Sequence, residues 1–179
     1  MGDVAGHGFG AAVIMGRLRS ALRAYALETN DPTETLTKLN RKVLHFEPDV
    51  TATVLYAVCD PSLERVRLAS AGHCPPVLAS PGRPARPVDM KLGVLLGLGG
   101  GVVRETTTID LPPGSVLCFY TDGLVERRGG TVPDGIDALC DAAYAGPPEA
   151  VSAAVMGSLI GRRLPEDDVA LLVVRRSPA

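Results

Sequence analysis

The chain opens with the stretch MGDVAGHGFGAA, residues 1–12, and the rest of the sequence can be understood by working outward from it. Asp3 follows a short apolar start, a glycine-rich turn comes next, and a long helical pattern begins directly after that turn. A carboxylate between a strand end and a helix N-terminus suits a divalent cation and an anionic substrate. Taken alone, such an Asp is more often a turn or helix-capping residue.

Two later stretches offer further carboxylates, because one carboxylate cannot hold a hard cation by itself. They read YTDG at residues 120–123 and EDDV at residues 166–169. Each adjoins an apolar run that predicts a buried strand, and rigid strand ends hold functional side chains well. Three such acidic turns favour one shared site over three unrelated turns, with Asp122, Asp167 and Asp168 as the partners of Asp3.

The composition excludes several classes of protein. A chain of 179 residues with 46% hydrophobic and 21% charged residues is expected to form one domain with an aliphatic core. The net charge of −2, the 4% aromatic content and the absence of Trp argue against a nucleic-acid surface. No apolar run is long enough to span a bilayer, and no signal-like segment opens the chain, so we expect a cytoplasmic protein without a membrane partner.

The four cysteines are widely spaced and form no C-x-x-C motif, so neither a zinc ribbon nor a disulfide framework is indicated. Cys59 and Cys118 lie inside apolar runs, and we interpret both as small core residues.

The hydrophobic pattern predicts a helical pair followed by strands. Residues 10–27 repeat apolar side chains at a spacing of three and four. Asp31 is the expected N-cap of a second helix, with Pro32 at its first position and Glu34 closing a capping box. The buried stripe of this helix is expected to contain Leu36, Leu39, Val43 and Phe46. Two weaker helices are expected at residues 135–144 and 148–160.

The remaining apolar runs predict strands. These strands cover residues 51–59, 65–71, 77–79, 102–111, 115–121 and 169–175. The glycine-dense segment at residues 92–101 is expected to be a loop packed against the body. Helices segregated from meandering strands favour the α+β class, with sheets packed against helices, over a doubly wound parallel sheet.

Five stretches resemble, in order, the motif series of the metal-dependent type 2C (PPM) serine/threonine phosphatases. They are GDVAGHG at 2–8, AT at 52–53, AGHCPP at 71–76, YTDGLVE at 120–126 and DDV at 167–169. The bacterial branch of stage II sporulation protein E and the sigma-regulation phosphatases is the most similar. The resemblance covers the whole chain, and it implies two stacked antiparallel sheets flanked by helices, an α-β-β-α sandwich.

The resemblance also implies a site for two Mn²⁺ or Mg²⁺ ions. Asp3 would bridge both ions, the backbone carbonyl of Val4 would bind one, and Asp122 and Asp167 would complete the other shell, with Asp168 as an adjacent candidate. All-oxygen ligands suit these metals rather than Zn²⁺. A water bridging the ions would attack phosphorus in line, so no nucleophilic Ser or Cys is needed.

Two histidines and one cysteine have alternative roles. His73 could donate a proton to the leaving seryl oxygen or orient a metal-bound water, or it could pin its turn through a hydrogen bond. His7 is expected in a turn or behind the metal ligands. Cys74 is adjacent to His73, but adjacent side chains in an extended turn point apart, so a thiol nucleophile is not expected.

The family normally begins with strands and an acidic segment upstream of residue 1, so the resemblance implies an N-terminally truncated domain. Missing strands would leave an unpaired strand edge, a setting for a homodimer.

Two functions follow as hypotheses. The first is a protein phosphatase acting on a phosphorylated regulatory protein of the anti-sigma-factor antagonist type, and the second is a catalytically inactive binding module of the same fold. Residues 92–101 and 127–131 are candidate substrate-facing loops.

Overall fold

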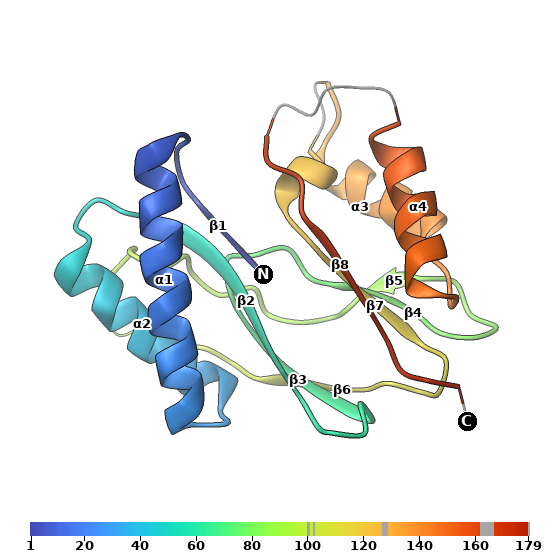
Figure 1. The fold of residues 1–179 in the computed structure, drawn as a ribbon, viewed down its shortest axis with the longest axis horizontal. Coiled ribbons are helices and arrows are strands. Elements are labelled where there is room, and N and C mark those ends of the chain that lie inside the picture. The colour runs from blue at the N-terminus through green and yellow to red at the C-terminus, as the bar shows by residue number, and fades with distance from the viewer. Residues whose placement is uncertain (100, 102, 127–128, 162–166, 179) are drawn as a thin grey trace. The chain divides into compact units, whose positions relative to one another are not determined.

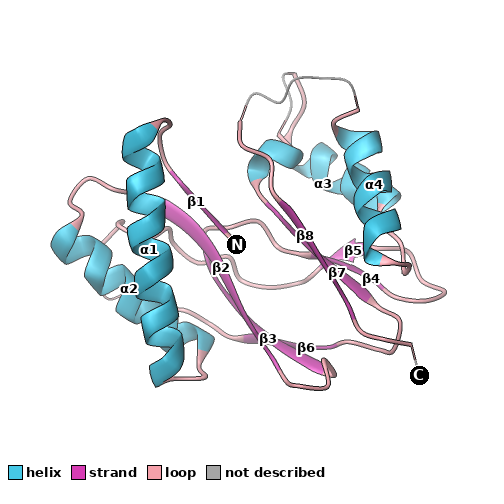
Figure 2. Ribbon diagram, viewed as in Figure 1, coloured by secondary structure: helices cyan, strands magenta, loops and turns pink. Residues whose placement is uncertain are grey.

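The computed structural model describes residues 1–99, 101, 103–126, 129–161 and 167–178. Within them lie four α-helices and two four-stranded sheets whose resolved pairings are antiparallel (Figures 1 and 2). The strand orders are β1-β2-β3-β6 and β5-β4-β7-β8. The α+β class expected from the sequence is confirmed. The chain divides into two compact units: Met1–Cys59, Val66–His73 and Met90–Ile109 form the first, and Asp60–Arg65, Cys74–Asp89 and Asp110–Ala179 form the second.

The first unit combines a helical pair with the first sheet. Figure 1 shows the helices side by side against the strands at the start of this sheet. The elements are β1 (Gly2–Val4), α1 (Phe9–Glu28), α2 (Pro32–Phe46), β2 (Ala52–Cys59), β3 (Arg65–Ala71) and β6 (Thr107–Asp110). Its core is aliphatic, and the buried residues Leu18, Leu36, Leu39, Val43 and Leu96 belong to it. The helical pair is therefore where the three-and-four spacing predicted it.

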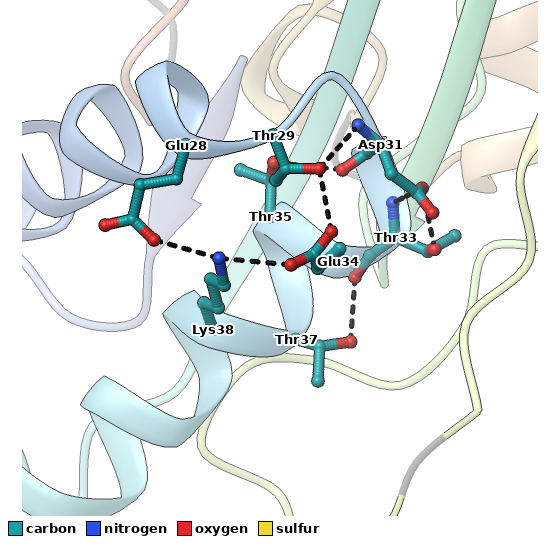
Figure 3. A network of polar contacts seen from close by, with 8 residues as sticks. All are labelled: Glu28, Thr29, Asp31, Thr33, Glu34, Thr35, Thr37 and Lys38. Atoms are coloured by element: carbon teal, nitrogen blue, oxygen red, sulfur yellow. Dashed lines mark hydrogen bonds and ion pairs between the residues drawn. The ribbon is translucent and has the colours of Figure 1, made fainter.

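Helix α2 confirms one sequence prediction and corrects two. Asp31 caps the helix, since its carboxylate accepts a hydrogen bond from the Thr33 amide at 2.8 Å. The capping box does not form, because the Asp31 amide bonds the Thr29 hydroxyl and Glu34 accepts from that same hydroxyl at 2.7 Å (Figure 3). Phe46, expected in the buried stripe, is 66% exposed and packs edge-on against His45.

The glycine-dense segment after residue 92 packs against the first sheet as a loop. Leu96 is fully buried and bridges Ala52 through paired backbone hydrogen bonds. Gly97 adopts a φ of +85°, and a Cβ at this position would lie 1.9 Å from the Val50 carbonyl oxygen, so only glycine fits. The strand expected over residues 102–111 is shorter than predicted, because its paired part is β6 alone.

The second unit packs two helices against the second sheet. Its elements are β4 (Val77–Ala79), β5 (Arg86–Pro87), β7 (Val116–Tyr120), the 3₁₀-helix η1 (Asp122–Leu124), α3 (Val132–Ala142), α4 (Pro148–Leu159) and β8 (Leu171–Arg175). All five residues of β7 are buried, as its uniformly apolar sequence predicts. The helix α3 begins three residues earlier than expected, because Thr131 and Asp134 form a capping box.

No disulfide joins any of the four cysteines. Cys118 is buried as predicted, but Cys59 is exposed because it lies at the end of β2. None of the helices within the described ranges is both long enough and apolar enough to cross a membrane.

Candidate metal site

Asp3 lies on β1, the edge strand of the first sheet, and its side chain is half-buried. It pairs directly with Thr53 of β2, and cross-strand partners point to the same face of a sheet. The two strands lie close here, because a Cβ on Gly2 would be 2.8 Å from the Thr53 carbonyl oxygen. The Asp3 and Thr53 side chains therefore lie next to each other on the same face of the first sheet.

The carbonyl of Val4 is directed away from β2. Met1 and Leu55 exchange two backbone hydrogen bonds of 2.9 and 3.0 Å, and the Ala5 amide donates to Thr51 at 3.0 Å. In an antiparallel ladder the intervening residues direct their N–H and C=O groups to the opposite side. The Val4 oxygen therefore points away from β2, and its role as a metal ligand stays a prediction.

His73 is held in a tightly bonded turn at the end of β3. Its ring is only 3% exposed, and Nδ1 lies 2.8 Å from the Thr53 hydroxyl oxygen. The His73 amide donates to the Ser70 hydroxyl, which donates in turn to the His73 carbonyl, both at 3.0 Å. These contacts match the turn-pinning role, and proton donation to a leaving group stays a prediction.

A buried arginine that the sequence reasoning missed supports the same turn. Arg104 is 8% exposed, and its Nη1 donates to the carbonyls of Val94 at 2.8 Å and Ser70 at 3.3 Å. Burial lowers the pKa of its guanidinium. The sequence signal that could have identified it is the position of an arginine directly after a run of glycines and valines. Arginine is rarely buried unless its charge is paired or hydrogen-bonded. Arg104 therefore ties the loop after residue 92 to the end of β3.

In the second unit, a threonine joins the two acidic turns. Thr121 is 5% exposed, and its hydroxyl donates to the Asp168 carbonyl at 2.8 Å and accepts from the Ala170 amide at 2.9 Å. Its own amide donates to the Ala170 carbonyl at 3.1 Å. The end of β7 is thus clasped to the residues just before β8. This clasp places Asp122 close to Asp167.

Gly123 makes that close approach possible. A Cβ at this position would lie 2.8 Å from the Asp168 carbonyl oxygen and 3.2 Å from that of Asp167. Asp122 starts η1, is half-buried and accepts a hydrogen bond from the Gly123 amide at 3.0 Å. Asp167 and Asp168 are exposed. The second unit therefore gathers carboxylates of the type that a hard cation prefers.

The cysteine beside these carboxylates is unsuited to nucleophilic attack. Burial raises the pKa of the Cys74 thiol, and the nearby Asp122 carboxylate raises it further. A thiol with a raised pKa stays protonated at neutral pH and is a poor nucleophile. This agrees with the expectation that Cys74 is not catalytic. His7 is exposed in the turn before α1.

The predicted ligands divide between the two units. Asp3 and Val4 belong to the first, and Asp122, Asp167 and Asp168 belong to the second. The structure describes the predicted ligands within each unit. That all of them form one metal site stays a prediction. Of the candidate substrate loops, residues 100 and 127–128 lie outside the described residues, as does residue 102 at the start of the expected strand 102–111.

Comparisons with known proteins place this chain in a family. A family model described as stage II sporulation protein E (SpoIIE) matches residues 1–177. Protein IcfG of Synechocystis is 29% identical over 73% of this chain and 25% of its own length. The chain therefore spans about a quarter of that curated relative.

Solved structures are also similar. The RsbU and RsbW domains of Rv1364c from Mycobacterium tuberculosis share 31% identity at a TM-score of 0.81, covering 99% of this chain and 51% of that one. RsbX in complex with magnesium shares 20% identity at a TM-score of 0.70, covering 96% of this chain and 77% of that one. The second likeness extends to the fold alone.

Proposed function

Since the chain belongs to the stage II sporulation protein E (SpoIIE) family, a sigma-regulation branch of the type 2C phosphatases, we propose that it is a metal-dependent protein phosphatase. Its substrate would be a phosphoserine or phosphothreonine on a small regulatory protein, of the kind that antagonises an anti-sigma factor. The similarity to a chain that contains RsbU and RsbW domains supports this substrate class.

The observation that carries the proposal is the Thr121 clasp, which holds Asp122 beside Asp167 in the second unit. We propose that Asp3 and the Val4 carbonyl join them around Mn²⁺ or Mg²⁺, with Asp168 as a further candidate. Every donor in this set is an oxygen, and such sets favour Mg²⁺ or Mn²⁺ over Zn²⁺. The magnesium in the similar RsbX structure supports the same choice.

The chain's own groups then have distinct tasks. When bound, the metal would neutralise phosphoryl oxygens and lower the pKa of the attacking water. The carboxylates would hold the metal, and the hydrogen bond between the Thr53 hydroxyl and His73 Nδ1 fixes the orientation of the imidazole ring. From that position His73 either donates a proton to the leaving seryl oxygen or orients the attacking water. Cys74 stays protonated and takes no part in bond making.

The decisive test is hydrolysis of a phosphoserine peptide by the purified chain with Mn²⁺, with and without EDTA. We expect metal-dependent turnover that falls at least about 100-fold in Asp3→Asn and Asp122→Asn. Asp141→Asn is the matched control, because Asp141 is an exposed carboxylate of α3 outside the site. Equal activity of Asp122→Asn and the wild-type chain would disprove the metal role of Asp122.

A catalytically inactive binding module is the second candidate. Calorimetry separates the two functions, because a phosphatase of this kind must take up Mn²⁺ and a pure binding module need not. The position of β1 at the edge of its sheet favours strand pairing with a second copy. Sedimentation equilibrium would detect such a homodimer as a mass twice that of the chain.

A further inference from the structure

Helix α1 has an unusual outward face. Its inward face carries the buried Leu18 and the partly buried apolar residues that pack with it. At about 100° per residue, six exposed residues fall within an arc of about 80° on the opposite side. This outer stripe consists of Phe9, Val13, Gly16, Ser20, Ala24 and Leu27, all of them exposed.

The outer stripe contains no charged residue, whereas a surface helix normally carries polar and charged residues opposite its core-facing side. Phe9 is 85% exposed and Leu27 is 91% exposed, so large apolar side chains stand in water at both ends. Small residues occupy the middle, where another backbone can approach closely. The stripe is about 27 Å long, since the 18 steps from Phe9 to Leu27 each rise about 1.5 Å.

Positive charge borders the outer stripe on both sides. Arg17 lies along one border, and Arg19 and Arg23 lie along the other. The Arg17 side chain is 58% exposed although it pairs with Glu47 at 3.1 Å. Glu28 is the only acidic residue of α1, and it is paired with Lys38 of α2 at 2.9 Å (Figure 3). The borders of the stripe therefore have a net positive charge.

We propose that the outer stripe is the docking surface for an amphipathic helix of a partner protein, with acidic residues on both sides of the partner's apolar seam. Apolar side chains of that helix would pack over the small residues of the stripe, and its carboxylates would face the arginine borders. The outer stripe shares no residue with the proposed metal site.

The charges and the small residues of the stripe disfavour two other occupants. A second copy of α1, in either orientation, would place arginine borders against arginine borders, and facing like charges are destabilising. A membrane surface needs bulky apolar side chains along the whole buried face, and the middle of the stripe offers only Gly16, Ser20 and Ala24.

The test uses a synthetic three-heptad peptide with Leu at positions a and d and Glu at positions e and g. We expect the full chain to bind it, as measured by fluorescence anisotropy, and to bind a matched peptide with Lys in place of Glu at least about tenfold more weakly. Ala24→Glu should weaken binding of the Glu peptide about tenfold or more. Arg41→Glu, on the exposed side of α2, should leave it unchanged.

A charge exchange makes the test specific. Arg23→Glu should weaken binding of the Glu peptide and strengthen binding of the Lys peptide, while the melting temperature of the exposed variants stays near that of the wild-type chain. Equal binding of the two peptides, or binding unaffected by Ala24→Glu, would overturn the proposal. Binding to phosphatidylglycerol vesicles, or a concentration-dependent dimer, that Ala24→Glu abolishes would also overturn it in favour of a membrane or a second copy.

Discussion

Replacement of Thr121 by Val tests the clasp between the two acidic turns. Valine keeps the shape of threonine but removes the hydroxyl, so the hydrogen bonds to the Asp168 carbonyl and from the Ala170 amide are both lost. Each is worth about 0.5–1.5 kcal/mol, which gives a loss of about 1–3 kcal/mol. Asp168 and Ala170 are exposed, so water compensates in part, and we expect a loss of about 2 kcal/mol.

For a chain of this size, that loss lowers the melting temperature by about 4–8 °C, measurable by circular dichroism. The same change frees the turn before β8, and supporting residues of this kind typically alter metal affinity by about 10–100-fold. Calorimetric titration with Mn²⁺ should therefore show weaker binding by Thr121→Val. Thr121→Ser is the control, because it keeps the hydroxyl and loses only a methyl group worth about 1 kcal/mol.

The two variants separate a positioning role from simple loss of packing. If the clasp positions the carboxylates, Thr121→Ser retains Mn²⁺ affinity and Thr121→Val does not. Equal Mn²⁺ affinity in the wild-type chain and Thr121→Val would refute the reasoning, whatever happens to the melting temperature.

Three further outcomes are expected. Thr53→Val removes the hydrogen bond to His73 and should lower the rate of phosphopeptide hydrolysis, with recovery in Thr53→Ser; equal rates in both variants would contradict it. Gly97→Ala places a Cβ 1.9 Å from a backbone oxygen at a φ of +85° and should destabilise the chain by more than about 2 kcal/mol in urea unfolding. The hydrogen bond from Lys42 lowers the pKa of the Glu47 carboxyl below its ordinary 4.5, so this group stabilises the fold above about pH 4.5 and loses that contribution as pH falls through the lowered pKa. Glu47→Gln should therefore lower the melting temperature at pH 7 and have a smaller effect at pH 3; an equal effect at both pH values would argue against the ion pair.

Local sequence determined most of the secondary structure. The apolar spacing placed α1 and the buried side of α2, and the uniformly apolar run before Asp122 placed β7. These patterns succeed because burial depends on the period of the apolar residues along one element. The prediction was wrong for Phe46 and Cys59, which lie at element ends where the core no longer covers them.

The capping interactions show the limit of local reasoning. The expected box at Asp31 does not form because Thr29, outside the helix, competes for both partners. The box at Thr131 forms and moves the start of α3. Both outcomes depend on which neighbouring side chain forms the hydrogen bond with a backbone amide. The spacing of a motif alone does not specify this.

The sequence by itself supplied the chemistry of the proposed site: candidate oxygen ligands at Asp3, Asp122 and Asp167, each in or next to an apolar strand. Only the tertiary structure revealed what supports them. It showed that the Thr121 hydroxyl clasps two segments 47 residues apart, and that Arg104 holds a turn 34 residues away. Hydrogen bonds between distant segments leave no periodic signal in the chain, because they depend on how the sheets bring those segments together.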